Sequence, residues 1–167
     1  MSDMDISVLI ARWLHIVAAI VALGGAAFVR FALLPACTAT LDESTHARLR
    51  EVVAARWSRV VHGAIGVLLV TGGFNFVRLA MSPDVEPMPY HAIFGLKFML
   101  ALLIFVIATA LVGRSAGFAG VRENARRWLS VLLALGAVVV LLSGSLHQVR
   151  TARTPAADSL VASPEQR

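Results

Sequence analysis

The sequence predicts an all-α, polytopic membrane protein whose four transmembrane helices form a bundle. Of its 167 residues, 58% are hydrophobic and only 15% are charged, and the mean hydropathy is +0.78. Four apolar runs each reach the roughly 20 residues that a helix needs to cross a bilayer. Because these runs are continuous, they favour helices over the alternating ~10-residue strands of a membrane barrel. The composition therefore excludes a soluble globular domain.

One transmembrane domain is expected over residues 1–150, with a disordered tail at 151–167 because that segment is short, polar and rich in small residues. Three prolines between Met81 and Pro89 predict an irregular turn. The expected spans are, in chain order, about 6–34, 58–79, 90–112 and 126–149.

A further, amphipathic helix is expected at about 43–57, before the second span. Asp42 opens a typical helix-start signal, and the apolar residues Leu49, Val52, Val53 and Trp57 follow it at helical spacing. This helix either lies in the membrane interface or extends the second span beyond the membrane.

The arginines predict how the spans are oriented. Nine lie between the first and second spans or between the third and fourth, and five lie on the opposite side. The positive-inside rule therefore places both termini on the outer, periplasmic side of a bacterial inner membrane. The formal charge of +5 comes mainly from arginines between the apolar spans, where they set the orientation in the membrane. Nucleic acid is therefore not an expected partner.

Ionisable side chains within the spans are the main candidates for function, because a charge in hydrocarbon needs a partner, a cavity or a role. At ~1.5 Å per residue, His15 and Lys97 lie about 13 Å and about 10 Å below the outer face, with Thr71 at about 12 Å and Asn75 at about 6 Å. Lys97 is the only lysine of the chain. His15 is expected either to bind a metal or move a proton, or to form a hydrogen bond between helices.

Other candidates lie nearer the ends of the spans. His91 and His147 fall within a turn of the outer surface, whereas His62 lies near the cytoplasmic end and is a candidate for a second metal site. Copper is a further candidate, because imidazole and thioether ligands suit Cu(I). The methionines expected on the outer half are Met4, Met81, Met88 and Met99.

Two short segments carry a resemblance to known membrane families. Trp13-Leu14-His15-Ile16 with Gly24-Gly25 and Arg30, and Tyr90-His91 leading into Gly95-Leu96-Lys97, resemble the copper-resistance protein D (CopD) type domain and the HemJ-type protoporphyrinogen oxidases. The resemblance covers about residues 8–150. It implies that His15 is associated with haem, that Lys97 is an essential charged partner and that Arg30 ends the first helix. The chain departs from the HemJ pattern at Ile20-Val21-Ala22-Leu23 and at Val29-Arg30, where that family has aromatic residues and a prolyl-arginine.

Three functions follow as hypotheses. The first is a b-type haem held in the outer half of the bundle, with His15 as axial ligand and Lys97 beside it, for electron transfer or, if the protein is an enzyme, porphyrin oxidation. The second is copper handling at an outer His/Met site. The third is a structural subunit of a larger membrane complex without a cofactor. The expected partners are the bilayer, membrane redox proteins and further copies of the chain. Residues expected at the haem are His15, Met99, His91, His147, Arg30 and Asn75, with Lys97 as the catalytic residue.

Overall fold

The computed structural model describes the backbone of residues 3–80 and 87–152, with side chains at 6–78 and 95–143. Within these ranges the regular elements are all helical, which confirms the all-α prediction. They are α1 (Asp3–Phe28), the π-helix η1 (Val29–Leu33), α2 (Leu34–Thr40), α3 (Glu43–Ala80), α4 (Pro87–Val112), the 3-10 helix η2 (Ala116–Phe118), α5 (Ala119–Glu123) and α6 (Ala125–Ala152). The irregular turn predicted over Met81–Pro89 was too long, because α4 already begins at Pro87, and the tail predicted from residue 151 begins no earlier than 153, because α6 continues to Ala152. Residues 81–86 and 153–167 lie outside the described residues.

The first helix does not end at residue 34 but continues to Thr40 through a π-helical segment. Pro35 explains the change of winding, because it lacks a backbone N–H and its ring clashes with the carbonyl one turn earlier. Within η1 the bonding shifts, and the N–H of Leu34 donates to the carbonyl of Val29, five residues earlier. The helix therefore passes the proline without breaking.

Asp42 precedes α3 and caps its start, because its carboxylate accepts hydrogen bonds from the Ser44 hydroxyl and, at 3.0 Å, from the Thr45 N–H. These bonds hold the pKa of Asp42 well below its usual range. From Glu43 the helix runs without interruption for 38 residues. The helix expected at about 43–57 is thus continuous with the helix of the second span.

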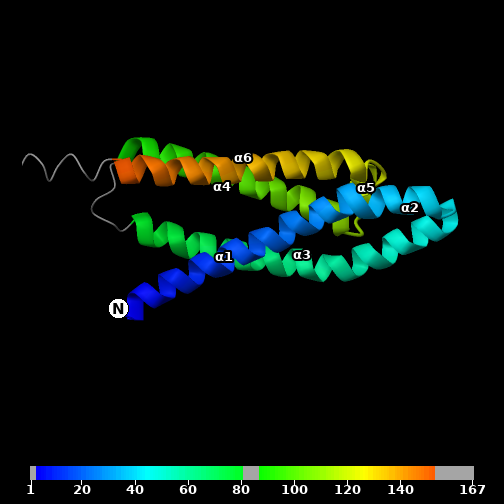
Figure 1. Cartoon of the computed structure of the whole chain (residues 1–167), viewed down its shortest axis with the longest axis horizontal. Helices are drawn as coiled ribbons and strands as arrows, with labels where there is room; N and C mark the ends of the chain where they lie inside the picture. Colours follow the sequence, from blue (N-terminus) through cyan, green and yellow to red (C-terminus); the bar gives the residue numbers. More distant parts are fainter. Residues whose placement is uncertain (1–2, 81–86, 153–167) are drawn as a thin grey trace, which may run out of the picture.

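At ~1.5 Å per residue, α3 is roughly 57 Å long, well beyond the ~30 Å of the hydrocarbon core. Figure 1 shows that α2 and the start of α3 form a hairpin extending past α5 at one end of the molecule. This hairpin carries several of the arginines between the first and second spans from which the orientation in the membrane was predicted.

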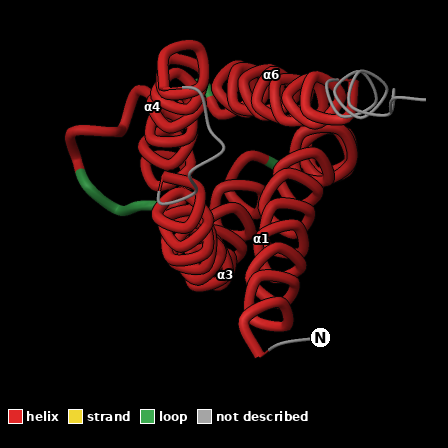
Figure 2. The backbone as a smooth tube through the Cα atoms, turned by 90° about the vertical axis from the view of Figure 1, so that its left-hand side faces the viewer, coloured by secondary structure: helices red, strands yellow, loops and turns green. Residues whose placement is uncertain are grey.

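The four long helices form a ring. Helix α1 packs against α3 and α6, and α4 packs against the same two helices. Viewed along the bundle, α4 and α6 lie on one side, with α1 and α3 on the other (Figure 2). Towards α5, a buried cluster of Ala26, Ile107, Leu129 and Leu132 packs α1, α4 and α6 together.

Small residues allow α1 to approach its neighbours closely. A Cβ atom placed on Gly25 would lie 2.0 Å from the Trp57 ring, so this glycine makes room for the indole. A Cβ atom on Gly136 would lie 2.5 Å from the end of Leu23. These two contacts join α1 to α3 and to α6.

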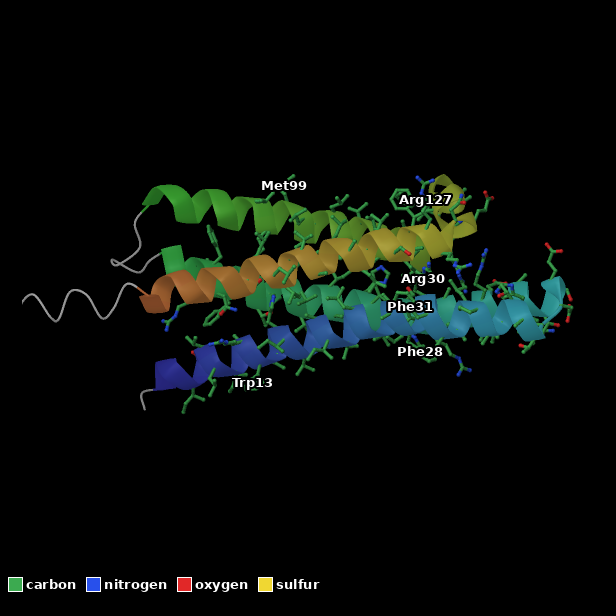
Figure 3. The ribbon with its side chains drawn as sticks, turned by 45° about the horizontal axis from the view of Figure 1, so that its top comes forward. Trp13, Phe28, Arg30, Phe31, Met99 and Arg127 are labelled. Atoms are coloured by element: carbon green, nitrogen blue, oxygen red, sulfur yellow. The ribbon has the colours of Figure 1, made fainter. Side chains whose placement is uncertain are left out.

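The outer surface of the bundle is apolar. Trp13, Phe31, Val70 and Leu141 are between 59% and 73% exposed, and Figure 3 shows Trp13, Phe28 and Phe31 along the outside of the first helix. Such a surface needs lipid around it. Four segments of the described residues are long and apolar enough to cross a membrane: Ile6–Thr40, Glu43–Arg78, Gly95–Val112 and Ala125–Ser143. The chain is a multi-pass membrane protein.

Candidate functional site

A cavity of about 1080 Å³ lies along the middle of the helix ring. Its walls are mostly apolar, and polar side chains gather towards its two ends. The His15 end contains His15, Asn75 and Lys97, and the arginine end contains His46, Arg50, Glu51, Arg114 and Arg122. Along α3, Arg50 and Gly72 are separated by roughly 33 Å at ~1.5 Å per residue. The cavity is thus long enough to present two chemically different environments.

The sequence predicts His15 and Lys97 at nearly the same depth and Asn75 nearer the outer face, and the structure brings all three to the lining of the same cavity. They come from three helices, α1, α3 and α4. Each is half-buried, so the polar groups lie at the edge of the apolar space. Thr71 is almost fully buried, with 6% of its surface exposed, and lies behind His15.

A two-bond chain holds the imidazole of His15. Its Nδ1 atom lies 2.8 Å from the hydroxyl oxygen of Thr71, and that oxygen lies 2.6 Å from the carbonyl oxygen of Val67. The carbonyl only accepts, so the single hydroxyl hydrogen of Thr71 is donated to Val67. Nδ1 of His15 must then carry the hydrogen of its own bond to Thr71. In the neutral ring, the lone pair is consequently on Nε2.

The bond from His15 to Thr71 is the hydrogen bond between helices that we expected as the alternative to a metal-binding or proton-transfer role for this histidine. It occupies Nδ1 alone. A histidine that binds a metal through one nitrogen usually donates the other N–H to a fixed acceptor, which sets the tautomer and the orientation of the ring. The structural bond and a ligand role are therefore compatible.

Gly72 allows the His15 ring to lie against α3. A Cβ atom at this position would be 3.5 Å from Cε1 of His15, which is van der Waals contact. An alanine would just fit, whereas a longer side chain would meet the ring. The position following Thr71 thus limits how far the imidazole can turn.

Arg30 lies in η1 and contacts α6. Its Nε donates a 2.8 Å hydrogen bond to the hydroxyl of Ser130, and its guanidinium lies 5.3 Å from the centre of the Phe31 ring. It does not line the cavity. The resemblance implied that Arg30 ends the first helix, whereas the helix continues past it to Thr40.

Met99 and His62 also lie outside the cavity lining. The side chain of Met99 is 64% exposed, and Figure 3 shows it on the outer side of α4. His62 is exposed, and its Nδ1 lies 2.7 Å from the carbonyl oxygen of Ser58 on the same helix. His91 and His147 belong to α4 and α6, and their side chains lie outside the described residues.

Within the side chains that the structure describes, no group of three or more His, Cys, Asp or Glu residues is arranged to hold a metal ion. A closed copper or zinc site needs such a group or a set of thioether ligands. A haem requires less, because its porphyrin already supplies four ligands and the protein adds an axial one. The donors at the His15 end fit this smaller requirement.

Sequence reasoning missed the residues of the arginine end. His46, Arg50, Val53 and Trp57 all line the cavity from the first part of α3. Their spacings of four, three and four residues place them on one helical face. The periodicity that predicted the amphipathic helix would have found His46 and Arg50 if it had been extended one turn towards the N-terminus. Cys37 is buried and lines the same cavity from α2.

Comparison of the chain with protein families, with curated proteins and with solved structures found no match.

Proposed function

We propose that this membrane protein binds a b-type haem at the His15 end of the cavity and transfers electrons within the membrane. The observation that carries the proposal is the bonding order Val67–Thr71–His15. It assigns the hydrogen of the neutral imidazole to Nδ1, so the Nε2 lone pair would be free to hold the iron of a haem.

The remaining residues fit a large, flat and mostly apolar cofactor. The volume of about 1080 Å³ is at the upper end of the roughly 300–1,000 Å³ of typical cofactor pockets. Apolar side chains from four helices suit the faces of a porphyrin, and the Lys97 ammonium suits its carboxylates. Asn75 offers a hydrogen-bonding side chain in the same part of the cavity.

When bound, the haem would supply reversible one-electron chemistry. The protein's own part is to position the haem and to keep water away from it. His15 would hold the haem through its Nε2 lone pair, and the hydrogen bond to Thr71 limits rotation of the imidazole. The apolar cavity walls would limit access of water, and the Lys97 ammonium would offset a carboxylate of the haem and act as a proton donor. Electron donors and acceptors would be membrane redox partners. We place the His15 end on the outer side of a bacterial inner membrane and the arginine end in the cytoplasm.

A reduced-minus-oxidised visible spectrum of the detergent-purified protein, from cells supplied with haem, tests the proposal. We expect a b-type spectrum in the wild type and its loss in His15→Ala. His62→Ala is the matched control, because His62 is exposed and bonds only within its own helix. Circular dichroism of each variant checks that the helices are retained. Copper is assayed on the same samples.

A colourless wild type would overturn the proposal, and so would a haem spectrum that His15→Ala leaves unchanged. In a colourless protein, bound copper would favour metal handling, and the absence of both would favour a structural subunit. Porphyrin oxidation is separated from electron transfer by assaying protoporphyrinogen with the haem-loaded protein.

Lys97→Met provides a second test. Methionine keeps the length of the side chain and removes the charge. A positive charge near the haem favours its reduced form, so the variant should retain haem but titrate at a lower midpoint potential. An unchanged midpoint potential would show that the charge of Lys97 does not act on the haem.

A further inference from the structure

A small cleft opens next to the arginine end of the cavity. Its volume is about 180 Å³, and it lies where α2, the start of α3, α5 and α6 meet. It shares Leu34, His46 and Arg50 with the large cavity, so the two spaces adjoin. The lining residues are Leu34, Pro35, Thr38, His46, Arg50, Glu123, Ala125 and Arg126.

The polar groups of this cleft have unused hydrogen-bonding capacity. Nε2 of His46 is buried and has no hydrogen-bond partner among the described residues. Leaving such an atom unpaired costs free energy, so native proteins rarely keep one without a ligand or water. Arg50 and Arg126 form no ion pair with a carboxylate in the part of the chain that the structure describes.

The charge around the cleft is positive. Arg50 and Arg126 line it together with Glu123, and the adjoining cavity wall adds Arg114, Arg122 and Glu51. Four arginines against two glutamates leave a net charge of +2, counting His46 as neutral. An anion is therefore favoured. The guanidinium groups can bind a phosphate through paired hydrogen bonds.

The shapes of the cleft and of the adjoining cavity indicate which kind of anion would fit them. The polar cleft has room for a phosphate, and through Leu34 it joins an apolar cavity inside a membrane-spanning bundle. A free phosphate would use only the cleft and leave the adjoining apolar walls empty. An amphiphile with a charged head and a hydrocarbon chain matches both parts. Basic pockets between transmembrane helices are suited to such lipids.

We propose that the cleft binds the headgroup of an anionic phospholipid, with its phosphate held by Arg50, Arg126 and His46 and an acyl chain entering the arginine end of the cavity. The site lies at the opposite end of the cavity from His15, goes beyond the proposed haem function and does not depend on it. It would couple the α2–α3 hairpin to α6 through a bound lipid.

Binding of phosphatidylglycerol to the full-length protein in detergent tests this site, by native mass spectrometry and by the shift in unfolding temperature. The double variant Arg50→Gln/Arg126→Gln is compared with Arg48→Gln/Arg127→Gln. The second pair removes the same charge from the neighbouring positions, which are exposed and line neither space. We expect about tenfold weaker phosphatidylglycerol binding in the first variant and wild-type binding in the second. Equal binding by the two variants would overturn the site.

Two further arms test the role of His46 and the need for a lipid. His46→Leu removes a buried nitrogen that bonds to no described group, so the lipid-free variant should be as stable as the wild type, while its stabilisation by phosphatidylglycerol should fall. A lipid-free variant that is clearly less stable would show a structural role for His46 instead.

Phosphatidylcholine and millimolar inorganic phosphate should each stabilise the protein much less than phosphatidylglycerol. Equal stabilisation by phosphate would refute a lipid site.

Discussion

Thr71 is both a hydrogen-bond donor to the carbonyl of Val67, at 2.6 Å, and the acceptor of the Nδ1 hydrogen of His15, at 2.8 Å. One hydroxyl thereby joins α1 to α3 and sets the tautomer of a histidine that lines the cavity. Because Thr71 is 6% exposed, water has little access to replace this bond. The threonine is a positioning residue for His15.

Thr71→Val keeps the shape of the side chain and removes the acceptor. The buried Nδ1–H of His15 then loses its partner, which should cost about 1–3 kcal/mol in the free energy of unfolding. Nitrogen-15 NMR of labelled histidine should show a mixture of tautomers for His15 where the wild type shows one. Thr71→Ser, which restores the hydroxyl, should recover the wild-type signal. A single unchanged tautomer in Thr71→Val would contradict this role.

Gly25→Ala tests the contact between α1 and α3. The added methyl group would lie 2.0 Å from the Trp57 ring, which is rigid, so the helices must move apart or the indole must turn. Overpacking of this kind costs about 1–3 kcal/mol. Denaturation in mixed detergent micelles measures the loss. Gly24→Ala is the control, because a Cβ atom there meets nothing within 4 Å and should change stability little.

A double-mutant cycle separates the clash from other effects of the alanine. With Trp57→Leu already in place, Gly25→Ala should be far less costly, because the ring that it meets is gone. Additive losses of stability would show that the two residues act independently.

Arg30 and Ser130 should be coupled. The 2.8 Å bond from the guanidinium Nε to the serine hydroxyl fixes η1 against α6, and a hydrogen bond to a charged group typically contributes about 1.5–3 kcal/mol. A cycle of Arg30→Lys and Ser130→Ala should give a coupling energy near the lower value, since lysine keeps the charge but lacks the planar group. Coupling within roughly 0.3 kcal/mol of zero would mean that the bond does not stabilise the fold.

The stability of the α2–α3 hairpin should depend on pH through the carboxylate of Asp42. Its pKa is lowered in the folded state by hydrogen bonds from Ser44 and Thr45, so the unfolded chain takes up a proton first as the pH falls. The contribution is complete above the ordinary value of 3.8 and is lost as the pH falls below it towards the lowered folded pKa.

Asp42→Asn keeps an oxygen that can cap the helix but removes the charge. The difference in unfolding temperature between wild type and variant should be largest near neutral pH and should shrink below pH 3.8. Thermal unfolding followed by circular dichroism at several pH values provides the measurement. A difference that stays constant with pH would exclude the carboxylate as its source.

Much of the fold follows from local properties of the chain. Length and apolarity identify a span, and the fixed rise per residue places His15, Thr71 and Lys97 at nearly one depth before any packing is known. The start of α3 after Asp42 could be predicted from the sequence, because helix capping depends only on neighbouring residues. Even so, the continuation of the first helix to Thr40 was not foreseen, because it depends on a change of winding before Pro35.

The amino-acid sequence alone is enough to show that the protein is all-helical, that it crosses the membrane, and that His15 and Lys97 lie at nearly one depth. The direction in which these side chains face depends on how the helices pack against one another. In a soluble helix the apolar stripe marks the inward face, but here both the lipid-facing and the inward-facing sides are apolar, so periodicity carries little information about rotation. That is why Lys97 lines the cavity while Met99, two residues later, lies on the outer surface. For the same reason, the bonding order at Thr71 and the cleft beside His46 emerge only when the helices are packed together.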